Sequence, residues 1–228
     1  MSELNENIVS CNACPRLVQW REEVAVVKRK AYLAEDYWGK PVTGFGSDKP
    51  LLVIVGLAPG AHGANRTGRI FTGDSSGDWL YGSLHRIGIA KIPTSTSKSD
   101  GQELKQTRIT MALHCAPPGN APTMEERDTC APWLRRELEL SLPTARAFVA
   151  LGGIGLAALV RALLALGHPV PKLKFGHGAE VKYSHEGVEY LLLASYHPSQ
   201  QNTFTGKLTK TQLDSVLQKA GRFAQVIK

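Results

Sequence analysis

This sequence has little of what membrane and secreted proteins usually contain. No run of about 18 apolar residues is present, so neither a membrane-spanning helix nor a membrane partner is expected. The first residues, Met-Ser-Glu-Leu-Asn-Glu-Asn, lack the basic and apolar regions of a signal peptide, which predicts a cytoplasmic location. No internal repeat or long linker divides the 228 residues, of which 43% are hydrophobic. We therefore expect one monomeric domain over residues 1–228 with a sizeable core.

Basic residues outnumber acidic residues, although no Lys/Arg tract is present. The formal net charge is +7. Such a charge favours a polyanionic partner, but an ordinary basic protein without such a partner would have the same composition. Charge alone leaves both interpretations open. A Walker A Gly-Lys-Ser/Thr motif is also missing, which disfavours a nucleotide hydrolase.

Apolar runs of strand length alternate with segments of helix length. We expect strands at 51–55, 109–113, 147–151 and 190–195, and helices near 17–33, 77–87, 124–140, 154–166 and 207–223. Thr123 and Glu126 have the spacing of a capping box, which supports a helix start there. Residues 93–105 are typical of a surface loop, and 172–189 could form a β-hairpin. This alternation predicts an α/β fold with three α/β/α layers around a central four-stranded, mainly parallel sheet.

Two of the expected strands end in loops of unusual composition. The first loop runs from Gly56 to Asp74 and contains glycines, a proline, two arginines and a phenylalanine. The second loop, His197-Pro-Ser-Gln-Gln-Asn202, follows the last expected strand. Glycines let backbone approach a ligand closely, and open α/β sheets bind ligands at strand ends. We expect the two loops to face each other across one cleft.

The chain has only four cysteines, and they form two pairs. Cys11 and Cys14 form a CxxC motif, and Cys115 and Cys130 flank a proline-rich loop. A CxxC turn brings two sulfurs onto one metal, and without a secretory signal metal binding is favoured over disulfides. Unlinked reduced thiols are the alternative. Four thiolates suit either zinc or a [4Fe–4S] cluster, and spacing does not separate the two.

The two loops resemble motif 1 and motif 2 of the uracil-DNA glycosylase superfamily. Gly56-Leu-Ala-Pro, Asn65-Arg-Thr-Gly-Arg69 and Phe71-Thr-Gly-Asp74 are most similar to family 5, the b-type bacterial and archaeal enzymes. The resemblance extends from Cys11 to about Asn202. It implies a monofunctional glycosylase that removes uracil from DNA by hydrolysis, with hypoxanthine and xanthine as further bases. The product would be an abasic site for base-excision repair. The alternative is a non-catalytic iron–sulfur protein that binds uracil-containing or abasic DNA.

The resemblance also separates the two metal alternatives. Families 4 and 5 hold a [4Fe–4S] cluster on a CxxC motif near the N-terminus and a later cysteine pair. It therefore implies that Cys11, Cys14, Cys115 and Cys130 ligate such a cluster. The cluster would clip the N-terminal segment to the loop between Cys115 and Cys130 and fix a surface near the DNA.

Breaking an N-glycosidic bond leaves positive charge on the sugar and negative charge on the departing base. Phe71 could stack on a flipped base, although most phenylalanines are core residues. His197 resembles the motif 2 histidine and could donate to a uracil oxygen, although a lone histidine is usually structural. Asp74 could stabilise the sugar cation or orient water, and it could also be the N-cap of a helix. Residues 56–60 carry no polar side chain, so Asp74 is the best acid available and His62 a weaker substitute.

Further residues are expected around these three. The resemblance suggests that Asn120 hydrogen-bonds the base edge or the sugar, and a plain turn residue is the alternative. The backbone at Gly56, Ala58 and Gly60 is expected to line the base pocket. Asn202 could hold its own loop instead of contacting DNA, and any single basic residue could be solvated surface charge. Six residues that flank the loops are expected at the DNA backbone: Arg66, Arg69, Ser199, Asn202, Lys207 and Lys210.

Overall fold

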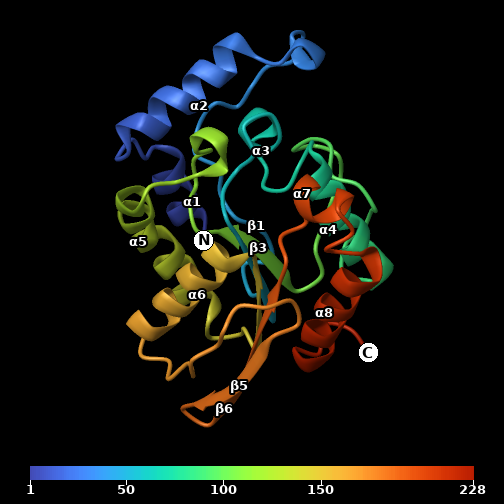
Figure 1. Cartoon of the computed structure of the whole chain (residues 1–228). Coiled ribbons are helices and arrows are strands. Elements are labelled where there is room, and N and C mark those ends of the chain that lie inside the picture. Colours follow the sequence, from blue (N-terminus) through green and yellow to red (C-terminus); the bar gives the residue numbers. More distant parts are fainter.

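A computed structural model describes residues 1–228, with one sheet between two layers of helices (Figure 1). The sheet has the strand order β1-β3-β2-β4-β6-β5. Strands β2, β3, β4 and β6 are parallel, and β1 and β5 are antiparallel strands at the two edges. The expected fold class is confirmed, with six strands in place of four. The strands are β1 (Phe45–Gly46), β2 (Leu52–Gly56), β3 (Thr107–Met111), β4 (Ala147–Leu151), β5 (Glu180–His185) and β6 (Val188–Ser195).

The helices divide between the two faces of the sheet. Helices α5 and α6 cover one face, and α4 and α8 cover the other (Figure 1). None of the helices combines the length and the hydropathy that a membrane crossing requires. The α-helices are α1 (Ser2–Val9), α2 (Pro15–Val27), α3 (Ala64–Thr67), α4 (Ser75–Arg86), α5 (Met124–Ser141), α6 (Gly153–Ala165), α7 (Gln200–Phe204) and α8 (Lys210–Phe223). Two short 3₁₀ helices are η1 (Lys30–Tyr32) and η2 (Pro118–Asn120).

Alternation along the buried strands creates the two cores. In β2, Leu52 and Ile54 pack with α4 and α8, whereas Val53 and Val55 pack with α5 and α6. All five residues of β2 are buried, as expected for a parallel strand with a helix layer on each face. Burial on both faces therefore explains why the strands read as continuous apolar runs.

Several expected boundaries need correction. The helix expected to end near residue 33 ends at Val27, because Lys28 adopts a φ of 57° that a helix cannot continue through. The helix expected from residue 207 begins at Lys210, where Thr209 and Gln212 form a capping box. Helices α1, α3 and α7 and strand β1 were not expected.

The other local expectations agree with the structure. Thr123 and Glu126 form the expected capping box at the start of α5. The segment 172–189 contributes β5 to a hairpin with β6, which begins at Val188. Glu186 and Gly187 both have positive φ in its two-residue turn, the geometry that suits such hairpins.

A buried ion pair joins α5 to the sheet. Arg108 of β3 donates from Nε to Glu137 Oε1 over 2.5 Å, and both side chains are almost fully buried. Thr110 donates to the second oxygen of Glu137 over 2.5 Å. The pair fixes the position of α5, which also carries Cys130.

The strand order also places a crevice. Strand β2 lies between β3 and β4, so the connections that follow β2 and β3 lead to opposite sides of it. In open α/β sheets ligands bind at such a switch point, beyond the carboxyl ends of the strands. Both loops singled out in the sequence follow such ends, at Gly56 of β2 and Ser195 of β6.

Candidate active site

Phe71 occupies a strained position above the end of β2. Its φ of 50° is rare for a bulky residue, and such strain persists where surrounding structure enforces it. The ring lies over Gly56, where an added Cβ would be 2.9 Å from Phe71 Cε2. The carbonyl of Phe71 faces Gly77, where a Cβ would be only 2.0 Å away. Two glycines, one in β2 and one in α4, thus leave room for this conformation.

Asp74 is the N-cap of α4, and its Oδ1 accepts a hydrogen bond of 2.9 Å from the Gly77 amide. The structural interpretation of this residue is thus confirmed. Its Oδ2 lies against the turn at Gly60 and Gly63, where added Cβ atoms would be 2.8 Å and 1.9 Å away. Burial, the largest cause, raises the pKa of Asp74, and Asp78 adds to this while the Gly77 amide opposes it. The carboxylate is therefore fixed in direction and poorly solvated.

His197 follows β6 and faces Phe71. The two rings are stacked, with centroids 5.6 Å apart and an interplanar angle of 28°. Burial lowers the pKa of His197 to about 4, so the imidazole is neutral near pH 7. The Asn202 amide donates to the His197 carbonyl over 2.9 Å, which fixes the loop. The two loops therefore meet through Phe71 and His197, and a cleft between them stays a prediction.

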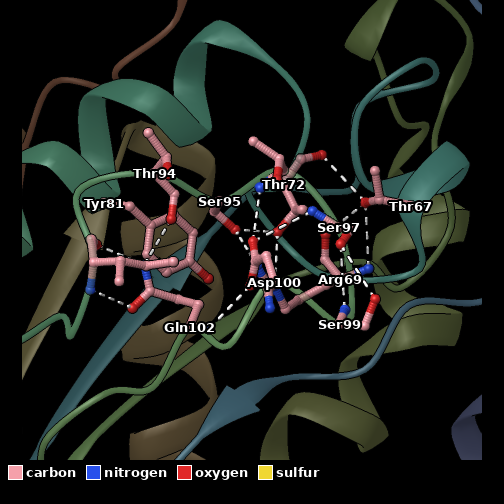
Figure 2. Close-up of polar contacts among 12 residues, drawn as sticks. Thr67, Arg69, Thr72, Tyr81, Thr94, Ser95, Ser97, Ser99, Asp100 and Gln102 are labelled. Atoms are coloured by element: carbon pink, nitrogen blue, oxygen red, sulfur yellow. Dashed lines mark hydrogen bonds and ion pairs between the residues drawn. The ribbon is translucent and has the colours of Figure 1, made fainter.

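The two arginines of the first loop are structural. Arg69 is 4% exposed and donates to Asp100 over 2.5 Å and to Ser95 over 2.7 Å (Figure 2). Arg66 is 7% exposed, forms an ion pair with Glu35 and donates to the Gly73 carbonyl over 2.8 Å. Their guanidinium groups are buried and paired, which disfavours contact with DNA phosphates, and the expectation that both bind DNA stays a prediction. Both hold the loop that carries Phe71 and Asp74.

The four cysteines line one small pocket. Arg21 is almost fully buried beside it and donates to Cys115 Sγ over 3.1 Å and to the Cys11 carbonyl over 3.2 Å. The His114 amide donates to Cys130 Sγ over 3.4 Å. No three Cys, His, Asp or Glu side chains are grouped as ligands of a single metal ion. The pocket therefore offers four sulfurs, with two N–H donors directed at them.

Comparison with known proteins places this geometry in a family. The family model of the uracil DNA glycosylase superfamily matches residues 43–221, which include Phe71, Asp74 and His197. The chain belongs to this superfamily. Named relatives cover nearly the whole chain. A type-5 uracil-DNA glycosylase of Mycobacterium bovis is 53% identical over 98% of the chain and 82% of the relative. Relatives of the same name from Thermus thermophilus and Pyrobaculum aerophilum are 48% and 44% identical, over 96% and 93% of the chain and 96% and 88% of their own lengths.

Within the superfamily pattern, the apolar part of motif 1 lies between the site and the cysteines. Leu57 and Ala58 are half-buried and pack on the small cluster of Leu17, Ala112 and Leu113, which Cys14, Cys115 and Cys130 also contact. The Gly60 carbonyl accepts from the amides of Gly63 and Asn65 at 3.2 Å and 3.0 Å. Motif 1 therefore links the cysteine pocket to the turn that holds Asp74.

Two other candidates lie apart from these contacts. Asn120 is exposed in η2 with a φ of 57°, so the turn interpretation is confirmed and a role in the site stays a prediction. His62 is half-buried and shares a hydrogen bond of 3.1 Å with the Tyr37 hydroxyl through Nδ1. Burial first, and then Arg29 and Arg66, lower the pKa of His62. Neither residue is connected to Asp74 by a hydrogen bond.

The lysines near motif 2 are exposed. Lys207 lies over the Tyr196 ring at 4.6 Å, and Lys210 lies over the Trp79 ring at 6.0 Å. Ser199 is the N-cap of α7 and is half-buried, with no side-chain capping bond. The DNA-contact expectation for these three residues stays a prediction.

Sequence reasoning missed some residues that build the site. Gly63 makes room for the Asp74 carboxylate, and Gly77 makes room for the Phe71 carbonyl. The sequence position of such a glycine does not predict which residue will pack against it. Arg21 lies in an ordinary helical segment, and its contact with the Cys115 sulfur, 94 residues later, has no local sequence signal.

Proposed function

We propose that this protein is a uracil-DNA glycosylase, which hydrolyses the N-glycosidic bond between uracil and deoxyribose in DNA. The observation that carries the proposal is the stacking of Phe71 on His197 beyond the carboxyl ends of β2 and β6. Asp74 belongs to the same loop as Phe71 and lies against Gly60 and Gly63. The names of the relatives and the superfamily match support the same activity. The product would be an abasic site that base-excision repair completes.

Phe71 would bind the extruded base. Taking a base out of the duplex costs a few kcal/mol, and stacking on an aromatic ring offsets part of that cost. In this structure the Phe71 ring is already fixed by the backbone strain and by its contact with Gly56. Little side-chain entropy of Phe71 is then lost on binding. The ring is 7% exposed and stacked on His197, so the imidazole would have to move aside for a base to stack on that face.

His197 would stabilise the departing base. With a pKa of about 4 it is neutral at pH 7 and donates an N–H to a uracil oxygen as a neutral group. Its buried position strengthens that hydrogen bond as negative charge develops on the base. Proton transfer from His197 is not required, because the N–H dipole alone lowers the energy of the anion.

Asp74 would act on the sugar side of the bond. The C1′–N1 bond breaks with its electron pair passing to N1, and the water oxygen bonds to C1′ while Asp74 accepts the water proton. Its raised pKa makes the carboxylate a better base than an exposed aspartate. Its negative charge also stabilises the positive charge that develops on the sugar.

We propose that hypoxanthine and xanthine are further substrates. Residues 56–60 present no polar side chain to the base, so discrimination by hydrogen bonding is weak there. A pocket that depends on stacking accepts any base with a flat face. The same duplexes carrying each base at one position measure this range.

We propose a [4Fe–4S] cluster at Cys11, Cys14, Cys115 and Cys130. The four thiols line one pocket, and the Arg21 guanidinium would offset part of the negative charge of four thiolates. Two N–H donors directed at sulfur also suit a cluster, whose properties depend on such bonds. The role proposed for the cluster is structural, and no chemical step passes through it.

A single-turnover assay of base release tests the proposed function. Wild-type protein should release uracil from DNA, and Asp74→Ala should slow release by roughly a hundredfold or more at nearly unchanged DNA affinity. His197→Ala should cost more with uracil than with hypoxanthine, since protonation of the purine ring assists its departure. Wild-type protein that binds uracil-containing DNA but releases no base would instead be a non-catalytic damage-binding protein.

A further inference from the structure

Trp38 organises two exposed lysines close to the proposed active site. The Lys98 ammonium lies 3.9 Å from the centroid of the Trp38 ring, and the Lys40 ammonium lies 5.6 Å from it. Both distances are within the range of cation–π attraction, which holds an ammonium group over an aromatic face. The two lysines come from segments almost sixty residues apart, so this arrangement depends on the fold.

Trp38 is attached to the first loop, which runs from Gly56 to Asp74. Its ring packs on Gly68, where an added Cβ would be 3.0 Å from the indole. Its backbone amide donates to the Arg66 carbonyl over 2.8 Å, and its Nε1 donates to the Pro41 carbonyl over 3.0 Å. The contact with Gly68 and these two hydrogen bonds therefore fix the position of the indole relative to the loop that carries Phe71.

Lys98 is also held in place, because residues on both sides of it bond to the same first loop. Figure 2 shows Asp100 and Ser95 joined to Arg69 and Thr72. The Gly73 amide also donates to the Ser95 carbonyl over 2.9 Å. Burial alone would raise the pKa of Asp100, but hydrogen bonds from Arg69 and backbone amides lower it below its usual range. Asp100 is therefore ionised near pH 7 and keeps its ion pair with Arg69.

The charges of both lysines are uncompensated. The only lysines that form ion pairs with carboxylates are Lys91 and Lys219. Lys207 and Lys210 near motif 2 share this pattern, since each lies over an aromatic ring without an acidic partner. Four of the five lysines held over aromatic rings thus lie on segments adjoining the two site loops, with Lys182 the exception.

We propose that Lys40 and Lys98, held on Trp38, form a phosphate-binding site for the DNA strand that carries the target base. This inference rests on the proposed function. Unpaired ammonium groups at fixed positions gain more from a phosphate than paired ones, because no existing ion pair has to break. The attachment through Gly68 and Arg69 holds the site at a constant distance from Phe71, so it fixes the register of the strand.

The salt dependence of DNA binding tests the site. Each lysine that neutralises a phosphate contributes about one unit to the slope of log affinity against log salt. Lys40→Ala and Lys98→Ala should each lower the slope by about one, the double variant by about two, and Lys98→Arg should restore it. Lys49→Ala is the matched control, because Lys49 is exposed, forms no ion pair and precedes the amino end of β2, whereas the site loops follow the carboxyl ends of the strands. If Lys40→Ala and Lys98→Ala both gave the same slope as the Lys49→Ala control, the inference would be overturned.

A scan with uncharged methylphosphonate linkages identifies the phosphate. At one position beside the target base the uncharged linkage should weaken binding by the wild-type protein and leave binding by the double variant unchanged. A loss of the same size in both proteins at every position would also overturn the inference. Both measurements report DNA binding, so they test the phosphate site even if the protein releases no base. Normal base release with an unchanged salt slope would overturn the phosphate site and leave the proposed function intact.

Discussion

Asp74 uses one carboxylate oxygen to cap α4, and its other oxygen is available for the proposed chemistry. Oδ1 caps α4 through the Gly77 amide, and Oδ2 lies against Gly60 and Gly63. The cap requires only a side-chain oxygen, whereas the chemistry requires a negative charge. An asparagine at this position separates the two demands, because it is about as good an N-cap as aspartate.

Asp74→Asn should therefore give a protein that is inactive but at least as stable. Burial raises the pKa of Asp74 in the folded state, so the folded protein binds this proton more tightly than the unfolded chain does. The resulting stability loss grows as pH rises from the unfolded pKa to the folded pKa and is complete above it. Asparagine removes that loss at pH 7, whereas Asp74→Ala also loses the cap, at about 1 kcal/mol.

Urea unfolding at pH 7 and near pH 3 measures this difference. The advantage of Asp74→Asn over the wild-type protein should shrink toward the acidic value, where the carboxyl group is protonated. Base release by Asp74→Asn should fall by roughly a hundredfold or more. An Asp74→Asn protein that retains near-full activity would transfer the assignment to His62 or Asn120.

At the scale of single residues, sequence motifs predicted what local chemistry determines. Asp74 followed by a helix start, and Phe71 in a polar loop, were recognisable from their neighbours. The burial of Arg69 was not, because it depends on Asp100, 31 residues later, folding back over the loop. The sequence shows that an arginine is present, but only the tertiary structure shows whether its guanidinium group already forms an ion pair with a carboxylate.

Among the secondary-structure elements, α5 is the one that depends most on a buried charge. Glu137 accepts from Arg108 and Thr110 of β3, with both charged side chains almost fully buried. Removing one partner of such a pair leaves the other as an uncompensated buried charge, which is more costly than losing both. Helix α5 also begins near η2 and carries Cys130, so its docking affects the cysteine pocket.

Glu137→Ala should therefore destabilise the protein by about 3–5 kcal/mol. The double variant Arg108→Met with Glu137→Leu should lose much less, because no unpaired charge remains in the core. Chemical denaturation of the wild-type protein, the single variant and the double variant compares the two losses. Equal losses in the single and the double variants would mean that packing, not charge, makes Glu137 important.

Long apolar runs made the strands and the central helices predictable, but element ends followed other causes. Helix α2 ends at Val27 because Lys28 adopts a positive φ that the lysine side chain does not require. Strand β1 has two residues and exists because β3 offers it a free edge, so it has no sequence pattern of its own. The short helices α3 and α7 lie inside motif loops, where glycines and prolines concealed them.

For the whole molecule, the cysteine pocket joins the N-terminal segment to the core. Cys11 and Cys14 come from the segment between α1 and α2, Cys115 comes from the loop between β3 and η2, and Cys130 comes from α5. Burial, the largest cause, raises the pKa of Cys130 to about 12, so ligation by a metal group must supply the energy that keeps this sulfur a thiolate. A cluster would thus hold the N-terminal segment against the core.

Anaerobically purified protein should contain about four iron and four sulfide per chain. Cys14→Ser should reduce both and make the first forty residues more sensitive to limited proteolysis, while the core fragment stays resistant. Asn12→Ala is the matched control, since Asn12 lies in the same turn and bonds Arg21 without offering sulfur. One equivalent of zinc with no iron would contradict the cluster.

The edges of the sheet have a consequence for how copies of this protein behave at high concentration. Exposed strand edges promote aggregation by pairing with other chains, and proteins prevent this with short or charged edge strands. Here one edge has only two residues, and the other carries Glu180 and Lys182, with Glu180 paired to Lys219 and Lys182 over Phe223 of α8. A strand added there would have to displace charges that are already held in place. Prolonged storage should therefore produce few β-rich fibres, and replacing Lys182 with an apolar β-branched residue should make them appear.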